Sequence, residues 1–274
     1  MSVTSVTVKD IMEVMEQIAP QRLAEGWDKP GLAIGDPERE VKKVLVALDV
    51  IEPVIEEAKR IGADMIITHH PMLLFRKIES ITADNPLGKR IFNLIENGIA
   101  AFSAHTNLDI ADGGTNDVLA ELAGLENIQI LEETSVAPDG KIDGIGRIGE
   151  LPRAMSFREF AKLLQERLGL DSIRLVGDGE KRIRRVALCT GAGVGFLSVA
   201  EALGADAYLT GDIKYHEAQQ AIEMGLAVAD VTHYASEVLI VPVLQKKLEA
   251  AAKENGWDIE VVCSEENGQT FWHI

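Results

Sequence analysis

The sequence has few cysteines, few aromatic residues and no long apolar run. Only two of its 274 residues are cysteines, Cys189 and Cys263, and both lie in apolar stretches. They predict two reduced core thiols rather than a disulfide framework or a CxxC metal site. Aromatic residues make up 5% of the chain, which argues against a surface that stacks nucleic-acid bases. The longest apolar runs, such as residues 44–48, are far shorter than the roughly 20 residues of a membrane span.

Basic residues are also scarce relative to acidic ones. The chain has 27 Lys and Arg against 44 Asp and Glu, a net charge of −17. Such a balance disfavours binding to nucleic acid or to an anionic membrane. The first ten residues lack the apolar segment of a signal peptide, so we expect a cytoplasmic protein.

The length predicts about two domains, each able to bury a core without a disulfide or metal. Near the start, Thr7 and Asp10 predict the first turn of a helix that ends before Pro20. Residues 26–38 are rich in Gly, Pro and Asp and predict an irregular loop.

A strand–helix–strand unit follows this loop. We predict strands at 44–50 and 64–70, with a helix at 53–61 that Gly62 terminates. Both strands are continuously apolar, as in a parallel sheet with both faces covered. The fold class is therefore α/β.

The same pattern returns later in the chain. Residues 42–70 align without a gap with 184–212, and both segments contain Gly-Ala-Asp before the second strand. A second match, at a different offset, aligns His105 with His233 and places an acidic residue four positions after each. We interpret this as an internal duplication that produces two similar lobes, each with a largely parallel sheet. The alternative is that two unrelated strand–helix–strand units look alike.

The duplication predicts a first lobe at residues 1–126 and a second lobe at residues 127–274. Residues 126–182 are predicted to be an ordinary connection, with turns at 138–140 and 144–149 and a helix at 157–169. Near the C-terminus we predict an amphipathic helix with Pro242 near its first turns, followed by a last strand at 258–264.

Polar side chains gather after the strand-like segments. They are His69, His70, His105, Asp109, His233 and Glu237. Ligands bind at the carboxyl ends of strands in open α/β sheets, so these side chains could share one site. Imidazole and carboxylate together suit Zn²⁺, Mn²⁺, Fe²⁺ or Co²⁺, and this number of donors is enough for two ions. The alternative is that each histidine is an ordinary core or surface residue.

Two further segments carry weaker signals. Residues 191–196 (GAGVGF) lie between a strand and a helix, but their spacing differs from the dinucleotide fingerprint and predicts a tight turn beside the metal site. Asp212, Lys214 and His216 either line that site or belong to a solvated loop. No GxSxG motif supports a serine hydrolase, and His273 is given no role.

Four strings in order, DMIITHHP, AHTNLDIADGGTND, TGDIKYHEA and THYASE, resemble one family. GWDKPGL and GAGVGF match it as well. This is the family of GTP cyclohydrolase 1 type 2 homologues, also called Nif-three-like proteins, which have a dinuclear metal centre. The resemblance implies a two-lobed fold with the metals between the lobes. It also implies a homohexamer built as a trimer of dimers.

The resemblance also implies the site residues. The metal ligands would be His69, His70, Asp109, His233 and Glu237, with Glu237 as the bridge between two divalent ions (Zn, Mn or Fe). We assign His105 a catalytic role, either in proton transfer or as a residue that supports a metal ligand without binding the ion.

The implied function is a metal-dependent hydrolase acting on GTP, another nucleotide or a related small molecule. Opening the purine ring of GTP requires addition of water, which suits metal chemistry. Two alternatives stay open. The chain could be a non-catalytic metal carrier or insertion factor, or a regulatory interaction protein.

Overall fold

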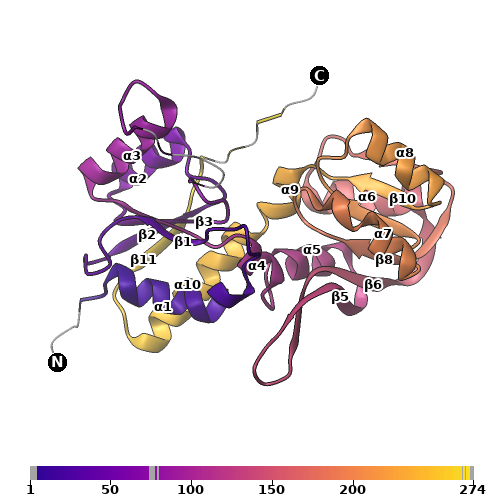
Figure 1. Ribbon diagram of the computed structural model, residues 1–274, viewed down its shortest axis with the longest axis horizontal. Helices are drawn as coiled ribbons and strands as arrows, with labels where there is room; N and C mark the ends of the chain where they lie inside the picture. The colour runs from indigo at the N-terminus through magenta and orange to yellow at the C-terminus, as the bar shows by residue number, and fades with distance from the viewer. Residues whose placement is uncertain (1–4, 74–77, 79, 267, 269, 272–274) are drawn as a thin grey trace. The chain divides into compact units, whose positions relative to one another are not determined.

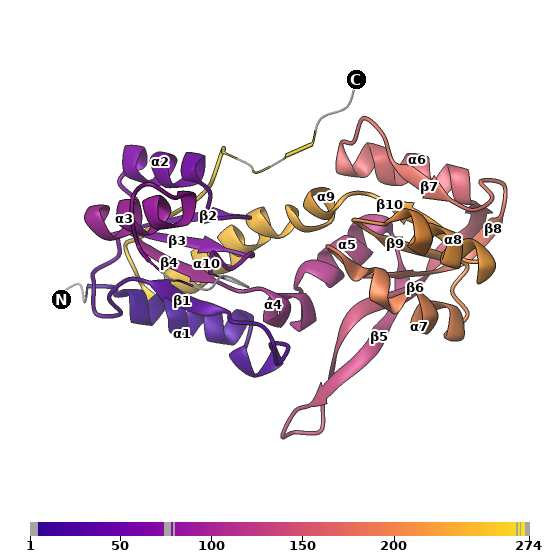
Figure 2. The same cartoon turned by 45° about the horizontal axis from the view of Figure 1, so that its top comes forward.

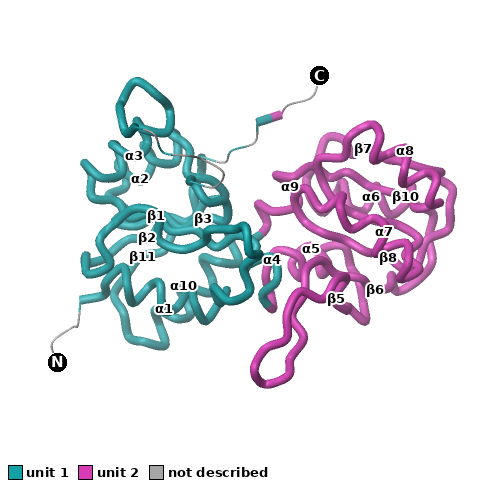
Figure 3. The backbone as a smooth tube through the Cα atoms, viewed as in Figure 1, with its two compact units in different colours: residues 1–111, 240–270 teal, residues 112–239, 271–274 magenta. Residues whose placement is uncertain are grey.

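The computed structural model describes residues 5–73, 78, 80–266, 268 and 270–271. The chain divides into two compact units (Figure 3). Unit 1 comprises residues 1–111 and 240–270, and unit 2 comprises residues 112–239 and 271–274. The chain thus leaves unit 1 earlier than the predicted boundary at 126/127 and returns to it near the C-terminus. The return was not predicted because it depends on a strand pairing between distant parts of the sequence.

Unit 1 contains a five-stranded sheet in the order β1-β4-β3-β2-β11 (Figure 1). The strands are β1 (Gly31–Ile34), β2 (Lys43–Ala47), β3 (Met65–Thr68), β4 (Ala100–Ser103) and β11 (Glu260–Cys263). All neighbouring pairs are parallel except β1 with β4. The predicted last strand therefore exists, but it pairs with β2 of the first unit. The predicted loop at 26–38 differs too, because four of its residues form the antiparallel edge strand β1.

Helices cover both faces of this sheet. They are α1 (Val8–Ile18), α2 (Glu52–Ile61), α3 (Pro86–Asn97), α10 (Ile240–Asn255) and the short α4 (Thr106–Ile110), with one 3-10 turn, η1 (Gln21–Leu23). Figure 2 shows α2 and α3 on one face and α1 and α10 on the other. The predicted capping box of α1 is present, and Gly62 ends α2 with φ of 67°. Leu45, Ile55 and Ile66 are fully buried in the core between the sheet and α2.

Unit 2 contains a six-stranded sheet in the order β5-β6-β8-β9-β10-β7. The strands are β5 (Glu126–Val136), β6 (Ile142–Ser156), β7 (Arg174–Val176), β8 (Arg182–Leu188), β9 (Ala207–Thr210) and β10 (Ala227–Asp230). The β8–β9 and β9–β10 pairs are parallel and the others are antiparallel. The expectation of a largely parallel sheet thus holds in unit 1, whereas the sheet of unit 2 is mixed.

The segment 126–182 is part of this second sheet rather than an ordinary connection. The predicted turn at 138–140 joins β5 to β6, but the glycine-rich segment 144–149 lies inside β6. Here Gly144 lies so close to the partner strand that a Cβ atom would meet the Glu132 carbonyl oxygen at 2.3 Å. Glycine at this position therefore reflects close strand packing, not a turn.

Helices complete the core of unit 2. They are α5 (Thr115–Ala123), α6 (Phe157–Leu168), α7 (Leu197–Ala202), α8 (Tyr215–Glu223) and α9 (His233–Glu237), with one 3-10 turn, η2 (Gly193–Phe196). The predicted apolar face of α6 buries Phe157 and Phe160 completely. No helix in the described part of the chain combines the length and apolar character needed to cross a membrane.

The two strand–helix–strand units use the shared Gly-Ala-Asp in the same way. In unit 1, Asp64 Oδ2 accepts hydrogen bonds from the backbone N–H groups of Lys42 and Lys43 at 2.8 and 3.0 Å. In unit 2, Asp206 Oδ2 accepts from Arg184 and Arg185 at 2.8 and 2.9 Å. In both units the aspartate thus binds the neighbouring strand at the point where the parallel pairing begins. The duplication itself stays a prediction.

The second predicted match of the repeat is shifted by one residue. The registers Thr68–Ser103 and Thr210–Asp230 make Ser103 the counterpart of Asp230. One residue, Ala104, separates Ser103 from His105, but two residues separate Asp230 from His233. His105 and His233 therefore do not occupy equivalent positions, because unit 2 has one extra residue before its histidine.

Substituting the shared aspartates tests their structural role. We expect Asp64→Ala and Asp206→Ala each to lower the free energy of unfolding by about 1–3 kcal/mol, because each leaves two backbone N–H groups without a charged acceptor. Urea denaturation measures this, with the exposed Glu254→Ala in α10 as the control. Losses no larger than that of the control would contradict the assignment.

Candidate metal centre

Three histidines of unit 1 converge at the carboxyl ends of its parallel strands. His69 and His70 follow β3 directly, and His105 follows β4 after one residue. Each histidine offers a ring nitrogen, and these three atoms lie within 4.8 Å of one another. The strand-edge argument is therefore confirmed for these three side chains.

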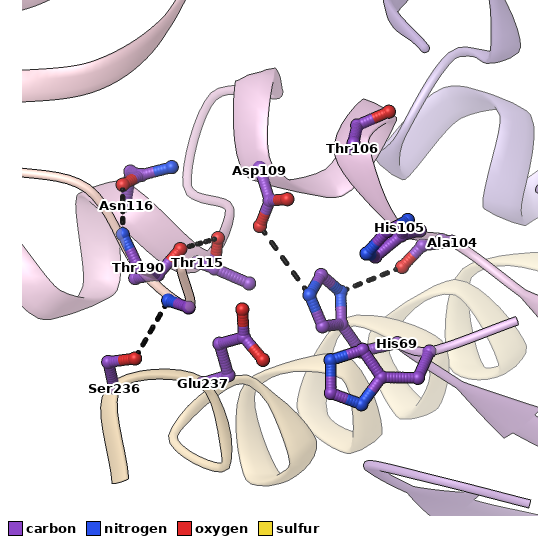
Figure 4. A network of polar contacts seen from close by, with 12 residues as sticks. His69, Ala104, His105, Thr106, Asp109, Thr115, Asn116, Thr190, Ser236 and Glu237 are labelled. Atoms are coloured by element: carbon purple, nitrogen blue, oxygen red, sulfur yellow. Dashed lines mark hydrogen bonds and ion pairs between the residues drawn. The ribbon is translucent and has the colours of Figure 1, made fainter. Parts of the chain in front are cut away.

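His69 is the most enclosed of the three. Its side chain is completely buried, and its Nδ1 lies 3.0 Å from the backbone carbonyl oxygen of Ala104 (Figure 4). A carbonyl can only accept, so Nδ1 carries the proton and Nε2 presents a lone pair. Nε2 lies 3.6 Å from Oδ1 of Asp109, a buried carboxylate on α4. The predicted ligands His69 and Asp109 thus lie side by side.

Carboxylates contact Nδ1 of the other two rings. Nδ1 of His70 lies 2.9 Å from Asp49 Oδ1, and Nδ1 of His105 lies 3.0 Å from Asp28 Oδ1. Neither aspartate was predicted from the sequence to have a role. Asp49 stands two residues after β2, so the rule about carboxyl ends of strands could have indicated it. Asp28 lies in the GWDKPGL segment, far from His105 in the sequence, and no local signal linked the two residues.

Asp28 is a buried carboxylate with several donors. It accepts hydrogen bonds from the Thr106 backbone N–H at 3.0 Å and the Thr106 hydroxyl at 2.6 Å, besides its contact with His105. Burial alone would raise its pKa, but the hydrogen bonds and the charge of His105 outweigh burial and lower the pKa to about 2. Asp28 is therefore an anion at neutral pH and fixes the orientation of the His105 ring.

Unit 2 places its own histidine and carboxylate together. His233 begins α9, and its Nδ1 lies 2.8 Å from Asp212 Oδ2. Its Nε2 lies 3.0 Å from Oε2 of Glu237, whose side chain is 4% exposed. The i,i+4 spacing on one helical turn brings these two predicted ligands together. Asp212 orients His233 as Asp49 orients His70.

The glycine-rich turn 191–196 supports Glu237. Gly191 has φ of 63°, and a Cβ atom there would lie 2.2 Å from Glu237 Oε1. The Gly191 N–H donates to Ser236 Oγ at 2.9 Å, and the Gly193 N–H donates to Thr210 Oγ1 at 3.0 Å. The preceding residue, Thr190, is held by contacts with α5 (Figure 4). The tight turn is confirmed, and its glycine lets the chain approach the glutamate closely.

The remaining sequence candidates have structural roles. The Lys214 N–H bonds Glu217 Oε2 at 2.7 Å at the start of α8, and His216 Nδ1 lies 3.0 Å from Gln219 Oε1 on the helix surface. Of Asp212, Lys214 and His216, Asp212 is thus the one that contacts a predicted ligand. His273 lies outside the described residues.

The donor set fits a divalent metal. Metal-binding histidines commonly donate one ring N–H to a carboxylate or carbonyl and present the other nitrogen to the ion. All four strand-end histidines show this pattern, with Nδ1 bound to Ala104, Asp49, Asp28 or Asp212. Imidazole and carboxylate donors together suit Zn²⁺, Mn²⁺ or Fe²⁺.

Asp28 has a testable effect on stability. Because folding lowers its pKa from 3.8 to about 2, the ionised group stabilises the fold by about 2 kcal/mol at neutral pH. This stabilisation is lost as the pH falls from about 4 towards 2. We therefore expect Asp28→Asn to be destabilising at neutral pH and progressively less so in acid, as measured by urea denaturation. Exposed Asp171→Asn is the control, and a pH-independent difference would contradict the prediction.

Comparison with known proteins agrees with the sequence resemblance. The family model of Duf34/NIF3 (NGG1p interacting factor 3) matches residues 6–269. A Clostridium perfringens protein named GTP cyclohydrolase 1 type 2 homolog is 42% identical over 267 residues, covering 97% of this chain and 99% of that protein.

Solved structures share the fold over the whole chain. A Bacillus cereus protein related to NIF3 has a TM-score of 0.92 at 26% identity, covering 99% of this chain and 100% of that one. Reduced HcgD from Methanocaldococcus jannaschii has a TM-score of 0.81 at 34% identity, covering 97% and 100%. By its sequence and its fold, the chain belongs to the Duf34/NIF3 family.

Proposed function

We propose that this protein binds two divalent metal ions and uses them to hydrolyse a small molecule. The proposed ligands are His69, His70, Asp109, His233 and Glu237. The observation that carries the proposal is the orientation of the histidines: each has its Nδ1 engaged by a carboxylate or a carbonyl, as in metal-binding histidines that present Nε2 to the ion. A purely structural core would have no need to orient several imidazoles in this one way.

The chemistry divides between the ions and the protein. Bound divalent ions would supply Lewis-acid activation of water and of a substrate oxygen. We assign proton transfer to His105, whose Nδ1 is held by ionised Asp28 at 3.0 Å. A carboxylate that binds one ring nitrogen fixes the orientation of the imidazole and stabilises the imidazolium that forms when the second nitrogen takes up a proton. Asp28 is thus the positioning group for His105.

The substrate class follows from the relatives alone. The Clostridium perfringens relative carries the name GTP cyclohydrolase 1 type 2 homolog, and ring opening of a purine is a hydrolytic step that metal ions can assist. We therefore propose a nucleotide or a related small molecule as the substrate. The homohexamer stays a prediction, which light scattering of the purified protein tests.

Metal content is the first test. We expect about two ions per chain by mass spectrometry of protein purified without chelator. His70→Ala and Glu237→Ala should each lower that number and abolish turnover, because each removes a donor. His216→Ala is the matched control, since this histidine lies on the surface of α8 beside Gln219. The folded state of each variant is checked by circular dichroism.

The outcomes separate the candidate functions. Full metal content in both variants would contradict the ligand assignment. Metal that is bound and transferred to an acceptor protein, with no turnover of any nucleotide, would favour a carrier over a hydrolase. A chain that takes up no Zn²⁺, Mn²⁺ or Fe²⁺ would remove both and leave a regulatory protein.

A pair of glycines in the 191–196 turn gives a second test. Gly191→Ala places a methyl group against the Glu237 carboxylate, whereas a Cβ atom at Gly195 meets nothing within 4 Å. We expect Gly191→Ala to weaken metal binding about tenfold or more, as other changes behind a metal ligand do. Gly195→Ala should leave metal binding unchanged. Isothermal titration with Zn²⁺ compares them, and equal affinities would refute the supporting role of this turn.

A further inference from the structure

The extra residue before His233 has an unusual backbone. Thr232 has φ of 72° and ψ of 151°, a region that is populated almost only by glycine. A β-branched residue there is strained and persists only where its surroundings enforce it. Its hydroxyl caps α9 by accepting from the Ala235 N–H at 3.2 Å. The strain therefore lies directly at the point where the chain turns to present His233.

Asp230, at the end of β10, holds this strained residue. The Asp230 side chain is 3% exposed. Its Oδ1 accepts from the Thr232 N–H at 3.0 Å, and its Oδ2 accepts from the Ile213 N–H at 3.2 Å. One carboxylate thus binds two loops at once, the loop that contains Asp212 and the loop that leads into His233. In unit 1, which lacks the extra residue, the counterpart is Ser103.

Arg174, on the edge strand β7, binds the Asp230 carboxylate. Its Nε lies 3.1 Å from Asp230 Oδ2, and its Nη2 contacts the same oxygen. Nη2 also donates to the Ile213 carbonyl oxygen at 2.8 Å. The guanidinium therefore neutralises the buried carboxylate and fixes the Asp212 loop by a second bond. Asp212 itself is left-handed, with φ of 56°, a conformation that aspartate adopts more readily than most residues.

We propose that Asp230, clamped by Arg174, is a positioning residue that aligns Asp212 with His233. The bond between Asp212 Oδ2 and His233 Nδ1 requires both loops to hold their conformations. Asp230 thereby keeps Asp212 Oδ2 against His233 Nδ1, and Nε2 of the ring then lies beside Glu237 Oε2 at 3.0 Å. The consequence for metal binding rests on the proposed function, whereas the effect on the imidazole does not.

Asp206 provides a matched control in the same sheet. It also accepts two backbone N–H bonds, but it does so from Arg184 and Arg185 of β8, just before the residues of β8 that pair with β9. Asp230→Ala and Asp206→Ala therefore each remove a carboxylate that bonds two backbone amides. A merely structural role for Asp230 predicts that the two variants behave alike at His233.

The first experiment uses the metal-free full chain. Proton–nitrogen correlation spectra of the histidine side chains report the hydrogen bond that Nδ1 of His233 donates. We expect a hydrogen-bonded Nδ1 proton in the wild type and in Asp206→Ala, and loss or a marked shift of that signal in Asp230→Ala. Arg174→Met should change the signal in the same direction. An unchanged Nδ1 signal in Asp230→Ala would overturn the proposal whether or not the chain binds metal.

The second experiment adds Zn²⁺ alone and includes a rescue. Asp230→Ala should weaken Zn²⁺ binding about 10- to 100-fold, as removal of a group behind a metal ligand does, and Asp206→Ala should not. Thr232→Gly relaxes the backbone strain, so adding it to Asp230→Ala should recover part of the affinity. Equal Zn²⁺ affinities in the two aspartate variants, or no recovery of affinity with Thr232→Gly, would contradict the positioning role of Asp230. A wild type that binds no Zn²⁺ would refute the proposed function and leave the Nδ1 signal of His233 to decide the role of Asp230.

Discussion

The candidate site depends on hydrogen bonds that hold each imidazole ring in a single orientation. Nδ1 of His69 bonds a backbone carbonyl, and Nδ1 of His70, His105 and His233 each meets a carboxylate. Rotation of a ring would break its bond, and for the fully buried His69 it would also leave a buried polar group unsatisfied, which is costly. The donor atoms are therefore arranged by the fold itself, and a cation would bind to side chains that need little reorganisation.

Strand geometry places these rings. Parallel strands β2, β3 and β4 end at one edge, so Asp49, His70 and His105 come from three consecutive strand ends. In unit 2 the parallel strands β8, β9 and β10 carry the glycine-rich turn, Asp212 and His233 at the corresponding edge. At the opposite edge of each sheet an aspartate ties the strand starts together. In each sheet, a residue that stabilises the fold thus lies near the strand starts, and the candidate metal ligands and their partners lie at the carboxyl ends.

The sequence predicted the strand-end histidines, the helix caps and both strand–helix–strand units, because these depend on residues that are close along the chain. It did not predict the partners of His105 and His70, since Asp28 and Asp49 come from other elements. Alignment by identity also paired His105 with His233, because matching residue types hides a one-residue insertion. Only the strand registers reveal Thr232 as the extra residue and Asp230 as its support. The pairing of β11 with β2 joins segments that are more than 200 residues apart, beyond any local pattern.

That pairing has a consequence for how the protein is made. The chain emerges from the ribosome at roughly 5–20 residues per second, and domains fold as they become complete. Unit 2 is almost fully synthesised before α10 and β11 appear, whereas the sheet of unit 1 still lacks its last strand. During that interval β2 is an open parallel edge beside a sheet face that α10 does not yet cover, the kind of surface that recruits chaperones or neighbouring nascent chains. The histidines of the first unit are thus translated early, but their scaffold is finished last.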